Sequence, residues 1–155
     1  MNHKNAMEKG KTYFEGDYNC AQSVLVALES VSGLDQLQSE ALTAGFGGGM
    51  GMHQEICGAV SGASMAISHA IFNKYEDHTQ GKEAAYNAVQ TIMTKFKEDM
   101  KHVRCSDLTQ CDFSDESQKA NFVESGVKAN ICVPAVTLAI QLAMELIEHE
   151  EHLSK

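Results

Sequence analysis

The feature that most constrains the fold is a glycine-rich stretch at residues 45–63, GFGGGMGMHQEICGAVSGA. It holds more than half of the chain's 12 glycines together with one cysteine, and it offers little side-chain bulk for a core. Glycine allows two stretches of backbone to approach closely and adopts conformations that other residues avoid. The stretch therefore predicts a turn packed tightly around the Cys57 sulfur. We expect its bare backbone N–H groups to face a bound group at Gly47, Gly48, Gly49 and Gly58.

The remaining sequence has the periodicity of helices. Small residues recur every four positions at Gly58, Gly62, Ala66 and Ala70, which predicts a long helix over residues 53–73 packed closely against a second helix. Apolar residues at helical spacing predict the other helices. These are longer helices over residues 5–15, 19–33, 81–102 and from Cys132 onward, and short helical turns over 39–44 and 117–125.

No strand-like alternation, internal repeat or linker interrupts this pattern, so the predicted fold is all-α. The length of 155 residues suits one domain spanning residues 1–155. We expect a bundle of about five to six helices, with the glycine-rich turn and one long cysteine-bearing loop over residues 103–117. Residues 136–147 are apolar nearly all round, which predicts that the last helix lies at the centre.

The charge and composition limit the class of partner and the compartment. A formal net charge of -9 disfavours binding to nucleic acid and to anionic membrane surfaces. No unbroken apolar run reaches the length of a membrane-spanning helix. The start, MNHKNAMEKGK, lacks the apolar stretch of a secretory signal, so we expect a cytoplasmic protein.

The five cysteines are the candidate functional residues. Cys20 and Cys132 are predicted in the first turn of a helix and Cys57 near the start of another, where N–H groups and the helix dipole favour a thiolate and lower its pKa. Cys105 lies in the long loop, from which it can reach the same site. Four thiolates need a strongly cationic partner, either the iron of a cluster or zinc. Cys111 could replace Cys105 as the fourth ligand, form a disulfide with Cys105, or have no role at the site.

Other interpretations of the cysteines stay open at this point. Buried cysteine is common as a small hydrophobic residue, and the chain has no C-x-x-C pair. Cys105 and Cys111 could form a reversible disulfide within CSDLTQC. Cys57 could be the nucleophile of a thiol–disulfide oxidoreductase, with a second cysteine resolving the mixed disulfide. Alternatively, zinc could be purely structural and supply folding free energy.

The order of the cysteines resembles the family of small redox-active proteins named for its C_GCAxxG_C_C pattern, whose hallmark is a CGAxxG core with three further cysteines. The core here is CGAVSG at residues 57–62, preceded by GFGGGMG. Cys20 in GDYNCAQSVL is similar to the first cysteine, Cys105 in RCSDL to the third and Cys132 in ICVPAV to the fourth. The resemblance covers about residues 10 to 145, and Cys111 departs from it.

The resemblance implies redox chemistry at the cysteines. A similar module in a cytochrome class is associated with an iron–sulfur centre, which favours an iron–sulfur cluster over zinc. We therefore expect an electron-transfer or redox-sensing protein with metal ligands Cys20, Cys57, Cys105 and Cys132. It would exchange electrons with a redox partner protein, and its methionine-rich, apolar helices are compatible with a homodimer.

Overall fold

A computed structural model gives the fold of residues 2–153, with the side chains described for residues 2–150. Within these residues the chain forms α-helices, one 3-10 turn and one π-helical turn, and its only β-type pairing is an isolated antiparallel bridge between Ile56 and Arg104. The all-α prediction is confirmed. The helices are α1 His3–Glu15, α2 Cys20–Ala27, α3 Glu29–Ser32, α4 Gln36–Thr43, α5 Gly58–Phe72, α6 His78–Met100, α7 Cys105–Thr109, α8 Glu116–Asn121 and α9 Val133–Leu153.

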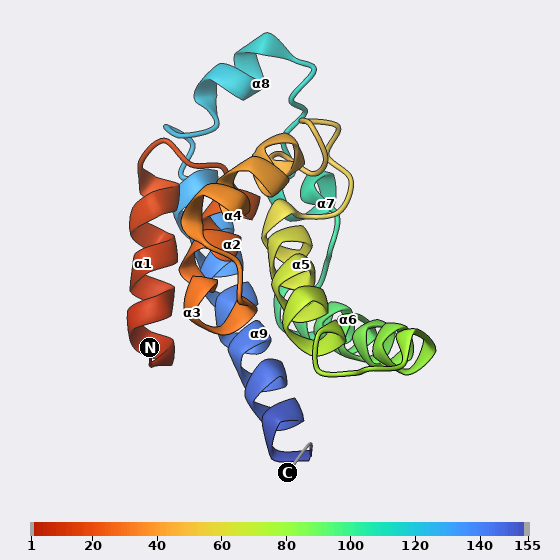
Figure 1. Cartoon of the computed structure of the whole chain (residues 1–155). Helices are drawn as coiled ribbons and strands as arrows, with labels where there is room; N and C mark the ends of the chain where they lie inside the picture. Colours follow the sequence, from red (N-terminus) through yellow and green to blue (C-terminus); the bar gives the residue numbers. More distant parts are fainter. Residues whose placement is uncertain (1, 154–155) are drawn as a thin grey trace.

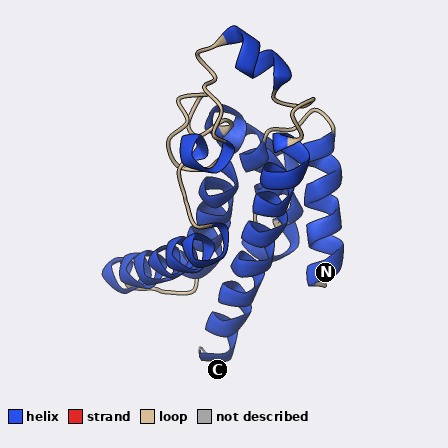
Figure 2. Cartoon of the chain, turned by 180° about the vertical axis from the view of Figure 1, so that it is seen from behind, coloured by secondary structure: helices blue, strands red, loops and turns tan. Residues whose placement is uncertain are grey.

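Helix α9 is the centre of the bundle, as its apolar sequence predicts. Helices α1, α2, α5 and α6 all pack against it. Figures 1 and 2 show α6 lying across the lower end of α5, while the start of α1 and the end of α9 lie together at that same end of the molecule. The small helix α8 lies beyond the opposite end, over the starts of α2 and α5.

The core is formed by large apolar side chains of these helices. Burying each of them contributes about 1.5–3 kcal/mol relative to leaving it in water. The fully buried residues include Leu25 and Leu28 near α2, Ile67 and Ile71 on α5, Ile92 and Phe96 on α6, and Ile140, Met144 and Ile147 on α9.

The stripe of small residues on α5 packs against α2. A Cβ atom added at Gly62 would lie 2.5 Å from the backbone oxygen of Ala21, so the two helix backbones touch at this point. Gly58 and Ala66 of the same stripe are also buried. The predicted close helix pair is therefore confirmed, and α2 and α5 form a fixed unit.

Local capping sets the start of α2. The Asn19 side chain accepts a hydrogen bond from the backbone N–H of Gln22, and the Gln22 side chain accepts one from the backbone N–H of Asn19. This reciprocal capping box satisfies two N–H groups that would otherwise lack partners. Cys20 is therefore held as the first residue of the helix, as predicted.

Three details of the predicted helices are wrong. The helix predicted from residue 53 begins only at Gly58, because Met52 and Gln54 have positive φ and cannot belong to a right-handed helix. The predicted loop over residues 103–117 contains α7, and short helices such as this raise the number above the five to six expected. Cys132 is not in a first helical turn, because a π-helical turn over Lys128–Cys132 precedes α9.

Helix α9 and the turn before it are long and apolar enough, by length and composition, to cross a membrane over Lys128–Glu150. Polar residues such as Thr137 and Gln141 interrupt this stretch, so it is not an unbroken apolar run. In the structure 44% of its most apolar window is buried inside the bundle. Central helices of soluble proteins pass the same test, so the stretch is only weak evidence for a membrane.

Candidate functional site

A pocket of about 230 Å³ lies at the end of the bundle near the starts of α2 and α5. The four cysteines predicted as ligands, Cys20, Cys57, Cys105 and Cys132, all line it. Cys111 is not among the lining residues, and all five cysteines are free thiols. The fold thus brings four residues that are far apart in the sequence to one cavity.

Cys20 and Cys57 come from the paired helices α2 and α5. Cys20 is the first residue of α2, and Cys57 is the residue immediately before α5. Between them lies Gly58, where an added Cβ would collide with the Cys20 sulfur and lie 2.8 Å from the backbone oxygen of Phe46. A side chain at position 58 would therefore displace the thiol.

The glycine-rich loop forms a left-handed turn. Residues 48–52 all have positive φ, and backbone N–H groups of Gln54 and Glu55 donate to Gly48 and Gly49 oxygens at 2.9 Å each. Met50 and Met52 adopt this conformation without glycine's freedom, with φ of 69° and 67°. Such backbone strain is tolerated only where the surrounding contacts impose it.

The four predicted glycines divide into two pairs. Gly48 and Gly58 line the pocket, and their backbone N–H groups lower the pKa of Cys20 against the larger effect of burial. Gly47 and Gly49 are not among the lining residues and allow close packing, because a Cβ at Gly47 would lie 2.6 Å from that of Asn19 and one at Gly49 would lie 2.7 Å from that of Cys105. Only the first pair therefore lies at the cavity.

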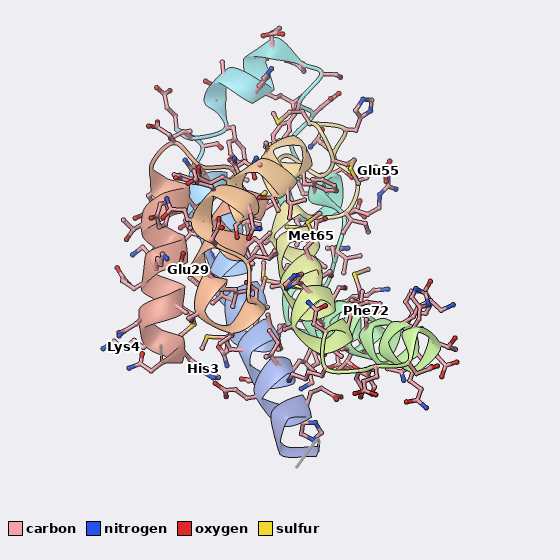
Figure 3. The ribbon with its side chains drawn as sticks, viewed as in Figure 1. His3, Lys4, Glu29, Glu55, Met65 and Phe72 are labelled. Atoms are coloured by element: carbon pink, nitrogen blue, oxygen red, sulfur yellow. The ribbon has the colours of Figure 1, made fainter. Side chains whose placement is uncertain are left out.

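The isolated bridge at Ile56 and Arg104 brings Cys105 beside Cys57. The Cys57 N–H donates to the Val103 oxygen at 2.8 Å, and the Cys105 N–H donates to the Glu55 oxygen at 2.7 Å. Outside the bridge, Arg104 and Glu55 form an exposed ion pair at 3.0 Å. Figure 3 shows Glu55 at the end of the molecule opposite His3 and Lys4. A pairing of single residues leaves no pattern in the sequence, so it could not be predicted.

Burial dominates the electrostatics of the cysteines, contrary to the prediction of lowered pKa values. It raises the pKa of Cys20 despite the N–H groups of Gly48 and Gly58, and it raises the pKa of Cys57. It also raises the pKa of Cys105 to about 11 and of Cys132 to about 12. Here the loss of hydration destabilises a thiolate more than the N–H groups at the helix starts stabilise it.

Charge on Cys20 is the second cause of the raised pKa at each of the three other pocket cysteines. A charge on Cys20 therefore acts on all three of the other pocket cysteines. Deprotonating all four would gather four negative charges in a buried space, which requires a cationic group between them. The donor set and the bare N–H groups of Gly48 and Gly58 fit such a group.

The rest of the pocket lining is mainly apolar and was not predicted from the sequence. The rings of Phe113 and Phe122 meet edge to face with centroids 5.2 Å apart, and both line the cavity. Lys119 and Lys128 are the cations of the lining, and the Lys128 ammonium lies 4.9 Å from the Phe14 ring centroid. These residues come from the segment around α8 and from the π-helical turn, where no helical periodicity indicates a shared face.

The thiols surround the cavity and do not converge on a point. Among residues 2–150, no three side chains of histidine, cysteine, aspartate or glutamate lie close enough together to hold a single metal ion. Any bound group would accordingly occupy part of the cavity that these four cysteines help to line.

Comparison with known proteins identifies the family. A family model described as "Putative redox-active protein (C_GCAxxG_C_C)" matches residues 18–146, which include all five cysteines and the glycine-rich loop. Neither the curated proteins nor the solved structures gave a match. The family name writes its core as GCAxxG, whereas residues 57–62 here are CGAVSG. Since the match covers most of the sequence, the chain belongs to the C_GCAxxG_C_C family of redox-active proteins.

Proposed function

We propose that the protein binds an iron–sulfur cluster through Cys20, Cys57, Cys105 and Cys132 and acts in electron transfer or redox sensing. An iron–sulfur cluster supplies reversible one-electron exchange when it is bound. The protein would work in the cytoplasm with a redox partner protein. The observation that carries the proposal is the presence of four cysteines from four separate segments in the lining of one cavity.

The size of the cavity favours a cluster over a single zinc ion. A tetrahedral zinc site needs all four sulfurs at about 2.3 Å from the metal. The four cysteines instead belong to the lining of a cavity of about 230 Å³ and do not gather around one point, which suits a group larger than a single ion. Metal analysis distinguishes such a cluster from a purely structural zinc site.

Residues of this chain would tune the bound group. The backbone N–H groups of Gly48 and Gly58 favour the Cys20 thiolate, and N–H groups near a ligand sulfur stabilise electron density on it. The side chains of Phe14, Phe113 and Phe122 limit access of water. The ammonium groups of Lys119 and Lys128 offset the negative charge that four thiolates bring.

The thiol–disulfide alternative is less well supported. A nucleophilic cysteine is accessible and has a lowered pKa. Cys57 is only 8% exposed, and burial followed by the charge of Cys20 raises its pKa. It therefore lacks both properties of an attacking thiolate.

Purification without oxygen, followed by visible spectroscopy and by iron, sulfide and zinc analysis, tests the proposal. We expect a coloured protein with iron and sulfide, and serine variants of the four pocket cysteines that each lose most of the iron. Cys111→Ser is the matched control and should keep its iron, because Cys111 does not line the cavity. Colourless protein with stoichiometric zinc would contradict the proposal, and so would equal iron loss in all five variants.

A further inference from the structure

Gln54 is a buried polar residue at the end of the left-handed turn. It is 8% exposed and has a φ of 59°, so neither its side chain nor its backbone is in a favourable position by itself. Glycine would adopt this backbone conformation at lower cost. The contacts of the side chain must therefore offset these costs.

The Gln54 amide connects the glycine-rich loop to the segment that carries Cys105. Its Nε2 donates to the Cys111 backbone oxygen at 2.6 Å and to Thr109 Oγ1 at 3.5 Å. Its Oε1 accepts from the Phe113 backbone N–H at 2.8 Å. The Gln54 backbone oxygen also accepts from the Ser106 N–H, at 3.1 Å. One residue thus fixes both ends of α7.

The Gln54 amide also reaches Cys105 through Thr109. The Thr109 hydroxyl that accepts from Gln54 Nε2 itself donates to the Cys105 backbone oxygen at 2.8 Å. Gln54 therefore helps to hold the segment that locates the Cys105 thiol.

We propose that Gln54 is a positioning residue for Cys105, which holds α7 against the glycine-rich loop. The inference rests on the proposed function, in which Cys105 is a ligand. It goes beyond that function by adding a residue outside the cysteines and glycines that adjusts one ligand of the four.

Two variants of Gln54 separate the amide from the backbone turn. Gln54→Gly keeps the left-handed conformation and removes the side chain, while Gln54→Met keeps the bulk and removes every hydrogen bond of the amide. Gln110 is the matched control, because it is a glutamine with a φ of 53° in the same segment but is exposed, and its Nε2 donates only to the Asp107 oxygen, at 2.8 Å.

The first measurement uses metal-free protein. Iodoacetamide labelling followed by peptide mass spectrometry gives the rate at Cys105 relative to the rate at Cys57. We expect both Gln54 variants to raise this ratio about tenfold, because α7 opens locally without its tether. Gln110→Gly and Gln110→Met should stay within about twofold of the parent protein, since that side chain is exposed. Unchanged labelling in both Gln54 variants would overturn the proposal.

The second measurement uses iron-loaded protein and detects what a merely structural residue would not change. A Cys105 thiolate that is no longer held in place should shift the ratio of reduced to oxidised protein at a fixed potential by at least about threefold in Gln54→Met, whereas Gln110→Met should keep the parental ratio. An unchanged ratio in Gln54→Met would show that Gln54 does not position this ligand. If the parent protein binds no iron, the proposed function fails while the labelling result still decides the role of Gln54.

Discussion

The two walls of the cysteine pocket are built by different means. Cys20 and Cys57 belong to a helix wall formed by α2 and α5, where backbone touches backbone at Gly58 and Gly62. Cys105 and Cys132 belong to a loop wall formed by α7 and the π-helical turn. The loop wall is joined to the glycine-rich loop by side-chain hydrogen bonds and a single bridge.

This difference predicts unequal responses to substitution. Backbone contacts leave no room for an added atom, so substituting a glycine of the helix wall should disrupt the contact between α2 and α5. A wall joined by individual hydrogen bonds loses only about 0.5–1.5 kcal/mol for each bond removed. We expect the helix wall to determine whether the site exists and the loop wall to adjust its properties.

Gly62→Ala should have the largest effect. In an open helix this change would stabilise by about 1 kcal/mol through helix propensity. Here the new Cβ would lie 2.5 Å from the Ala21 backbone oxygen, so α2 and α5 must separate. Overpacking of this kind costs about 1–3 kcal/mol or more, so we expect a net loss of about 2 kcal/mol in the free energy of unfolding by urea.

Gly45→Ala is the control for that measurement. Gly45 has no atom within 4 Å of the position of an added Cβ, and its φ is not positive. Its free energy of unfolding should remain within about 0.5 kcal/mol of the parent value. If Gly62→Ala unfolds like Gly45→Ala, the helix wall is not held by direct backbone contact.

Gly58→Ala should act on the site more than on stability. The added methyl group would contact the Cys20 sulfur and lie 2.8 Å from the Phe46 oxygen. Since Cys20 is the shared neighbour of the other pocket thiols, its displacement should remove most of the bound iron. Iron analysis and the melting temperature check this expectation. Full iron content would show that α2 and α5 can accommodate the methyl group without displacing Cys20.

Much of the helix wall was predictable from local sequence. The capping residues Asn19 and Gln22 mark the start of α2 and therefore place Cys20, and the spacing of Gly58 and Gly62 indicates a close helix contact. These signals work because caps and helical stripes depend on residues within one or two turns of each other. The order of the cysteines then completed the predicted ligand set.

The loop wall was predictable only in its cysteines. The bridge between Ile56 and Arg104 joins single residues far apart in the chain, and the left-handed turn extends past the last glycine to Gln54. The pKa direction also failed, because the desolvation that raises the pKa of Cys132 depends on the folded environment. Long-range contacts and burial, unlike caps, leave no local pattern.

Lys128→Met should have the smallest effect and tests the contribution of charge to the loop wall. Burial, followed by the charges of Cys20, Cys105 and Cys111, raises the pKa of Cys132 to about 12, and the Lys128 ammonium opposes this. Without the ammonium the pKa rises further, so at a fixed pH below it the thiolate fraction falls. In metal-free protein we expect alkylation of Cys132 to slow by about two- to threefold, as befits a partly screened charge.

Lys119→Met is the comparison for this variant, because Lys119 lines the same pocket but is exposed, so solvent screens its ammonium more strongly than that of the half-buried Lys128. Alkylation of Cys132 should then keep its parental rate, and the free energy of unfolding should change little in either variant. Raising the salt concentration should diminish the effect of Lys128→Met, since screening weakens the ammonium's field in the parent protein. Faster alkylation in Lys128→Met would instead show that the side chain holds the π-helical turn in place, and the loop wall would then depend on packing as the helix wall does.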